Sequence, residues 1–226
     1  MKERPVIFNS EMVCAILDGR KTQTRRVMKP QPEPCYRGGH WWPSNTFKTM
    51  LHIEEQMQNG AGGWGGLAGD ACPFGAVGDR LWVRETWQGP LVDEEHLDDY
   101  RANADKFQAP EFCEYAADGG ARPEFCDFDD NVRQGWRPSI HMPRWASRIT
   151  LEITAVRVER LNDISEEDAK AEGVTPSQHI ITPPEALYRV GFLKLWQSIY
   201  GAESWSANPW VWVIEFRRVG GSDASK

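Results

Sequence analysis

The chain has 226 residues, 11 tryptophans, five cysteines and a formal net charge of −7. No stretch approaches the roughly 18 consecutive apolar residues of a membrane helix, and an odd number of widely spaced cysteines argues against the paired framework of a small secreted protein. The charged residues Met1–Arg4 are not followed by the apolar run of a signal peptide, so we expect a cytoplasmic protein with no membrane partner.

The negative charge is concentrated in one segment. Thirteen of the 33 acidic residues and three of the 26 basic residues lie between Gly89 and Asp130, which leaves 23 basic against 20 acidic residues elsewhere. Because attraction to phosphate depends on local charge, the net charge does not exclude a nucleic-acid or nucleotide partner. The tryptophans serve equally well as core residues or as stacking surfaces for bases.

The first predicted element is a helix from Asn9 or Ser10 to Asp18, which Gly19 ends. The segment Arg20–Val27 is rich in Thr and Arg and reads as a turn leading into a strand. Prolines and glycines then dominate, so we interpret residues 30–77 as a long, loop-rich insertion.

The alternation of Arg80–Trp87 predicts a half-buried strand. Residues 89–136 show no sustained periodicity and few aliphatic side chains, and we interpret them as a second, solvated insertion. Apolar positions in Arg148–Arg160 change parity, which predicts a long strand with a bulge near Ala155.

The last third of the chain contains two predicted helices and a strand. Ser165 resembles the start of a capping box, and its short helix ends at Glu172 and Gly173. A packing helix is predicted over Glu185–Tyr200, with one seam formed by Leu187, Gly191, Leu195 and Ile199 and with Phe192 and Trp196 beside it. The apolar run Trp210–Phe216 predicts a strand buried on both sides. We expect one α+β domain over residues 1–219 and a disordered tail over residues 220–226.

Three sequence features together resemble the ASCH family. They are Gly19-x-Lys21-x4-Arg26 after a helix, a Gly78-Asp79 turn before a strand, and the terminal strand Trp212–Phe216. The resemblance implies a PUA-like fold, a small β-barrel with accessory helices. Within the family, Gly19–Arg26 and Asp163–Glu172 look like the catalytic segments of bacterial N4-acetylcytidine amidohydrolases, and the overall arrangement also resembles ASCH proteins of phages and prophages.

The resemblance implies Thr24 as nucleophile, Lys21 as proton acceptor and Glu172 as proton donor. Lys21 then needs a pKa below its ordinary range, through burial or a nearby arginine, and Glu172 needs a raised pKa. On a straight strand Lys21 and Thr24 would lie roughly 10 Å apart on opposite faces, so we predict that Lys21 to Thr24 forms a turn. The competing interpretation is an ordinary solvated Lys and Thr with an exposed carboxylate at the helix end.

A pocket for a modified nucleoside or nucleotide would also need binding residues. The predicted ones are cationic, acidic or aromatic: Arg26, Trp82, Glu85, Trp87, Arg144 and Trp145. No cofactor or metal is predicted, because Cys35, His40, His52 and Cys72 lack a zinc-site spacing and Asp127, Asp129 and Asp130 lack a full calcium-loop pattern.

Two alternatives to hydrolysis stay open. The chain could be an RNA- or nucleotide-binding ASCH module, non-catalytic or ribonucleolytic, in which Lys21 and Arg26 contact phosphate. In the other, the acidic insertion is a surface for protein interaction or nucleic-acid mimicry. The sequence does not indicate an oligomeric state.

Overall fold

The computed structural model describes residues 1–36, 38–57, 67–126, 131–179 and 181–219. It is a mixed α+β structure that divides into two compact units. The first comprises Met1–Lys2, Asp18–Arg80 and Glu152–Arg217, and the second Glu3–Leu17, Leu81–Leu151 and Arg218–Lys226. The single domain predicted over residues 1–219 stays a prediction, and the predicted tail, residues 220–226, lies outside the described residues.

The sheet of the first unit is built around the C-terminal strand. Strand β12 (Trp210–Val219) pairs antiparallel with β2 (Gln23–Val27), with Trp212 opposite Arg26. The strand β11 (Thr150–Arg160), whose first two residues belong to the second unit, adjoins the other edge of β12. Its buried residues change from odd to even positions between Ile153 and Val156, as the sequence predicted. The apolar strand β12 is buried over most of its length, which confirms the predicted core strand.

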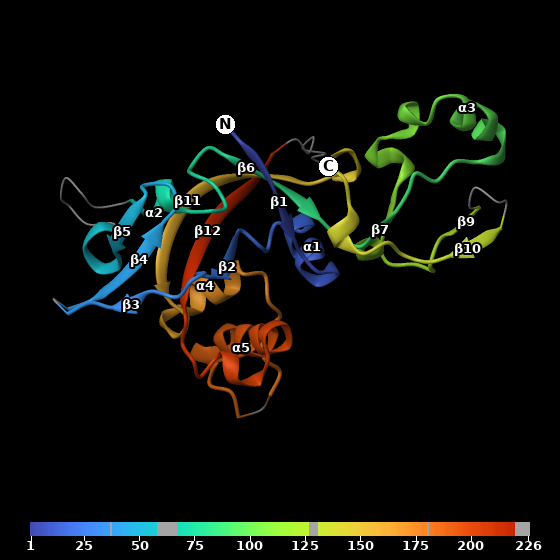
Figure 1. Cartoon of the computed structure of the whole chain (residues 1–226). Coiled ribbons are helices and arrows are strands. Elements are labelled where there is room, and N and C mark those ends of the chain that lie inside the picture. Colours follow the sequence, from blue (N-terminus) through green and yellow to red (C-terminus); the bar gives the residue numbers. More distant parts are fainter. Residues whose placement is uncertain (37, 58–66, 127–130, 180, 220–226) are drawn as a thin grey trace. The chain divides into compact units, whose positions relative to one another are not determined.

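Helices α4 (Glu166–Ala171) and α5 (Leu187–Tyr200) also belong to this unit, and Figure 1 shows them below β2. Helix α4 begins at Ser165, whose hydroxyl accepts from the Asp168 amide, and α5 packs against it. Their core consists of Leu161, Ile164, Ala169, Val174, Phe192, Trp196, Val211 and Val213. The buried seam of α5 therefore runs through Phe192 and Trp196, and Ile199, expected on the seam, is 48% exposed.

The first insertion contains more regular structure than the sequence indicated. Strands β3 (Glu33–Pro34), β4 (His40–Ser44) and β5 (Thr49–His52) form an antiparallel sheet, followed by a π-helical turn (Ile53–Met57) and α2 (Ala68–Ala71). Trp42 of β4 contacts Trp212 edge to face at 5.3 Å between centroids. The loop-rich segment predicted over residues 30–77 therefore also contains short strands and helical turns, which the tertiary packing of tryptophans stabilises despite a Pro-rich composition.

The second unit contains β1 (Glu3–Ile7), α1 (Ser10–Leu17) and, except for its first residue, β6 (Arg80–Arg84), which lies beside β1. The predicted first helix is confirmed, and Asn9 Oδ1 accepts from the Met12 amide at 2.9 Å. The strand expected over Arg80–Trp87 ends at Arg84, and β7 (Trp87–Gln88) pairs instead with β8 (Glu114–Tyr115). The second insertion also holds α3 (Leu97–Ala102), β9 (Glu124–Cys126) and β10 (Val132–Gln134).

Short 3-10 helices link the elements: Glu94–His96, Ala104–Phe107, Pro110–Phe112, Ala116–Asp118, Ser139–His141, Arg144–Ala146, Leu161–Asp163, Pro184–Ala186 and Ala202–Ser204. In neither unit do the described strands close into a barrel. No helix among the described residues is both long and apolar enough to cross a membrane.

Candidate functional site

Lys21 and Glu172 meet in the first unit because two short backbone segments run side by side. Gly19 has a φ of +74° and Gly173 a φ of +78°, values that glycine adopts without strain, so the chain turns sharply beside each residue. Lys21 and Glu172 form an isolated antiparallel bridge, and the Thr22 amide donates to the Ala171 carbonyl at 2.9 Å. Two residues 151 positions apart are thereby placed opposite each other.

The side chains of this pair form a buried ion pair. Lys21 Nζ donates to Glu172 Oε2 at 2.8 Å and to the Glu172 carbonyl oxygen at 2.9 Å. Arg25 Nη1 donates to the other carboxylate oxygen at 3.0 Å. The Lys21 and Glu172 side chains are 0% and 2% exposed, so the carboxylate is held by two cations away from solvent.

A larger ionic network continues from Arg25. Its guanidinium also binds Glu159 and Asp168, and Gln23 Nε2 donates to the Asp168 carbonyl oxygen at 2.8 Å. Arg157 binds Asp168 at 2.9 Å. Arg157 further bonds to Glu159 and to Glu215, whose side chain is 41% exposed, so the network reaches solvent at that end.

The surroundings change the proton affinity of Lys21 and Asp168, among other members of the network. The pKa of Lys21 is lowered from its ordinary value, and burial is the largest cause. Glu172 acts to raise the pKa, whereas the cations Arg26 and Arg25 lower it further. The expected direction is confirmed, with burial as the largest cause. At Asp168 burial acts to raise the pKa, but Arg157 and Arg25 outweigh it and the pKa is lowered.

Thr24 does not lie in a turn with Lys21, so that prediction was wrong. Thr24 is buried within β2 opposite Ile214, and the Phe216 amide donates to the Thr22 carbonyl at 2.8 Å, which keeps this backbone extended. Lys21, Gln23 and Arg25 all bond to α4 or to Glu172, the residue that follows it. Because side chains alternate along a strand, Thr24 points to the opposite face.

The predicted binding residues belong to different units. Arg26 lies in β2 opposite Trp212, in the same unit as Lys21. Trp82, Glu85, Trp87, Arg144 and Trp145 all belong to the second unit. Their role in binding a substrate of the Lys21 site stays a prediction.

Within the second unit these residues form two clusters of arginines and aromatic rings. Arg84 and Arg144 lie over the Trp82 ring, 5.0 and 5.9 Å from its centroid, and Trp87 contacts Trp145 edge to face at 5.6 Å. The contacts of Arg84 and Arg144 with Trp82 are typical of arginine beside indole. Trp82 and Trp87 are both buried.

Glu85 is a second buried carboxylate, 1% exposed. Arg148 binds both of its oxygens at 3.0 Å and also binds Asp118 at 2.8 Å. Burial raises the pKa of Glu85, and Arg148 counteracts only part of that effect. A bidentate arginine fixes this carboxylate in place, as a structural ion pair requires.

The residues considered for a metal do not gather around one point. Within the described ranges there is no group of three or more His, Cys, Asp or Glu side chains that could hold a metal ion. His40 is bonded to Glu54 at 2.7 Å and to Arg160 at 3.1 Å, and His52 is bonded to the Gly38 carbonyl at 2.9 Å. Cys35 and Cys72 form no disulfide within the described part of the chain, and Asp127, Asp129 and Asp130 lie outside it.

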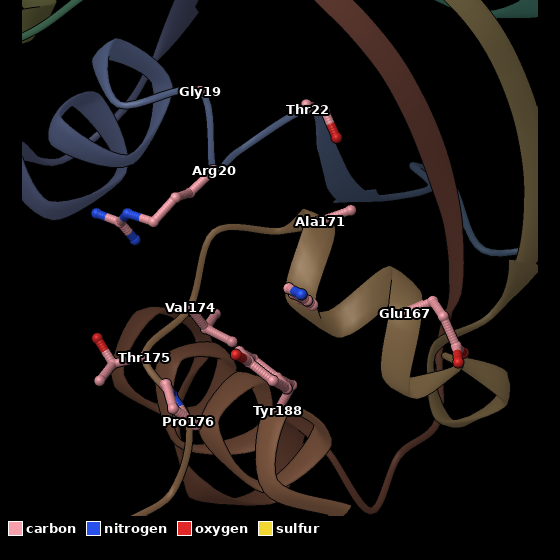
Figure 2. A pocket seen from close by; sticks show the side chains of 10 residues that line it. Gly19, Arg20, Thr22, Glu167, Ala171, Val174, Thr175, Pro176 and Tyr188 are labelled. Atoms are coloured by element: carbon pink, nitrogen blue, oxygen red, sulfur yellow. The ribbon is translucent and has the colours of Figure 1, made fainter.

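A pocket of about 570 Å³ lies beside the bridge in the first unit, and sequence reasoning did not identify it. Figure 2 shows it between the Gly19–Thr22 segment, the end of α4 and the start of α5. Its lining comprises Gly19, Arg20, Thr22, Glu167, Lys170, Ala171, Val174, Thr175, Pro176 and Tyr188. The sequence signal that could have indicated this pocket is the alternation of side chains around Lys21, because it places Arg20 and Thr22 on the side away from Lys21.

The chain matches no protein-family model, no curated protein and no solved structure. The arrangement of charges, burial and cavities in the described residues is therefore the basis for assigning a function.

Proposed function

We propose that this chain is a metal-independent amidohydrolase with a PUA-like ASCH fold, which cleaves the acyl amide of N4-acetylcytidine or a related N4-acylated cytosine nucleoside. The observation that carries the proposal is the contact of Lys21 Nζ with Glu172 Oε2 at 2.8 Å. The resemblance assigns these two residues to proton transfer, and such transfer requires hydrogen-bond distance between the groups that exchange protons or a shared substrate atom.

The chemistry needs a neutral amine and an acid in one place. Burial and the neighbouring arginines lower the pKa of Lys21, which favours the uncharged amine that accepts a proton. A nucleophilic O–H adds to the acyl carbon as its proton passes to Lys21, and the C–N bond breaks as Glu172 protonates the departing N4 nitrogen. If the nucleophile is Thr24, a water then hydrolyses the acyl-Thr ester. The proton on Lys21 returns to Glu172, which restores both groups. Cytidine and the carboxylic acid are the products of the overall addition of water.

The identity of the nucleophile divides the proposal into two forms. If Thr24 attacks, the start of β2 must change its backbone on substrate binding, because Thr24 lies on the face opposite Lys21. If water attacks, Thr24 contributes to packing beside Ile214 and β2 keeps its conformation. The Thr24→Ala variant separates the two, since it abolishes acyl transfer in the first and keeps most of it in the second.

One observation favours a second candidate, a non-catalytic or ribonucleolytic RNA- or nucleotide-binding ASCH module. The Lys21 and Glu172 side chains are 0% and 2% exposed, so a substrate reaches them only if the surrounding backbone opens. In the second candidate the ion pair is structural. Of the two residues expected to contact phosphate, Lys21 is then held in the ion pair, and the half-buried Arg26 would make the contact.

The test is incubation of the purified chain with N4-acetylcytidine, without added metal, and chromatographic measurement of cytidine release. We expect release by the wild type and a loss of about 10²–10⁴-fold in Lys21→Met and in Glu172→Gln, the usual range for removing a general acid or base. Lys194→Gln, which removes an exposed cation from α5, is the matched control and should keep full activity. Circular dichroism establishes that each variant is folded.

A folded wild type that releases no cytidine would refute the amidohydrolase. The binding module is then tested by fluorescence anisotropy with a labelled single-stranded RNA over a range of salt concentrations. Affinity that falls steeply with salt supports phosphate contacts, and affinity that does not change with salt excludes them.

A further inference from the structure

The pocket beside α4 and the buried ion pair lie on opposite sides of the same two backbone segments. Lys21 and Glu172 face each other in the antiparallel bridge, and their side chains join the network with Arg25. Their sequence neighbours Arg20, Thr22 and Ala171 line the pocket, as alternation of side chains requires. Neither Lys21 nor Glu172 lines it, so the pocket is a separate site.

The floor of the pocket is apolar and packs against the hydrophobic core of the first unit. Val174, 9% exposed, belongs to the hydrophobic cluster that contains Phe192 and Trp196. Ala171, Pro176 and the ring of Tyr188 complete the apolar lining, and Figure 2 shows Val174 and Tyr188 close together beneath the end of α4. At about 570 Å³ the pocket is within the size range of small-molecule sites, roughly 300–1,000 Å³.

Two cations and one carboxylate stand at the rim. Arg20 binds Asp18 and donates to the Gly173 carbonyl, so its charge is already balanced. Lys170 Nζ lies 5.8 Å from the centroid of the Tyr188 ring. In Figure 2 the Glu167 side chain lies across α4 from Val174 and Thr175. Of these groups, the Lys170 ammonium is the cation best placed to meet an anion, since an aromatic face balances it less than a carboxylate would.

We propose that this pocket binds a small organic anion with a planar aromatic body. The body packs on Val174, Pro176 and Tyr188, and the anionic group contacts the Lys170 ammonium. The inference goes beyond the proposed hydrolysis, because it uses neither Lys21 nor Glu172 and holds whether or not the chain cleaves an amide.

The test is a titration of the isotope-labelled full chain followed by NMR amide shifts, with phenyl phosphate as the probe. Inorganic phosphate supplies the anion alone and phenol supplies the ring alone. With phenyl phosphate we expect amide shifts clustered at Thr22 and at residues 170–175. Inorganic phosphate and phenol should each bind at least several-fold more weakly than phenyl phosphate. Lys170→Gln should weaken binding on the order of fivefold, and Lys194→Gln should leave it unchanged.

Three outcomes would overturn the proposal. Shifts that do not cluster at the pocket remove the site itself. If phenol binds as tightly as phenyl phosphate, the anionic group contributes nothing and the pocket binds apolar rings alone. If inorganic phosphate binds as tightly, the ring contributes nothing and only the surface charge attracts the anion. Lys170 is exposed, so its replacement leaves the fold intact and the comparison with Lys194→Gln valid.

Discussion

Replacing Glu172 by Gln should destabilise the chain more than replacing Lys21 by Met. Glu172 bonds to two buried cations, Lys21 at 2.8 Å and Arg25 at 3.0 Å. Its replacement by Gln leaves Lys21 Nζ beside a neutral amide, whereas Arg25 keeps its contacts with Glu159 and Asp168. Breaking a buried ion pair on one side costs about 3–5 kcal/mol. The Lys21→Met variant leaves Glu172 still bound by Arg25, so we expect a smaller loss, on the order of 1–3 kcal/mol.

Urea unfolding followed by tryptophan fluorescence measures these differences, and Asp18→Asn is the matched control. It removes the same charge from the Arg20–Asp18 pair, whose side chains are 51% and 58% exposed, and should cost about 0–1 kcal/mol. The reasoning is refuted if Glu172→Gln costs no more than Asp18→Asn, or if Lys21→Met costs more than Glu172→Gln.

Three further perturbations follow from other described contacts. The pKa of Asp168 is lowered in the folded state, so its stabilising contribution is present above the ordinary pKa of about 3.8 and is lost as the pH falls through the folded value. The urea midpoint of the wild type should therefore fall in acid, and this fall should be smaller in Asp168→Asn when midpoints are measured at several pH values. A Cβ on Gly191 would lie 2.3 Å from the Thr175 carbonyl oxygen, so Gly191→Ala should lower stability by about 1–3 kcal/mol, whereas Gly69→Ala, with open space around it, should be neutral or stabilising in the same assay. If Lys21 is the proton acceptor, its lowered pKa means that kcat/KM for N4-acetylcytidine should rise with pH through that pKa, at values below 10.5; a flat profile would contradict the role.

Elements with strong local signals could be predicted from the sequence. The capped helix α1, the parity change of β11 and the apolar strand β12 all follow from periodicity and capping, which act over a few neighbouring residues. The end of α4 immediately before Glu172 and Gly173 was predictable for the same reason, to within one residue.

Features that depend on distant partners could not be predicted. The sheet of β3, β4 and β5 packs through Trp42 on Trp212, a residue 170 positions later, and composition carries no signal for that contact. The turn expected between Lys21 and Thr24 fails because pairing with β12 keeps the chain extended. The sequence indicated only that an arginine could lie near Lys21, and the bonds of Arg25 to Glu159, Asp168 and Glu172 depend on the tertiary fold.

The 151-residue separation of Lys21 and Glu172 affects how the chain folds during its synthesis. At about 5–20 residues per second, the ribosome adds Glu172 roughly 8–30 s after Lys21. Over that interval Lys21 and Arg25 lack the Glu172 carboxylate to which both bond, and β2 lacks β12, its partner from the last part of the chain. The N-terminal segment therefore completes its packing only late in translation, and a nascent chain stalled before residue 172 should be protease-sensitive around β2.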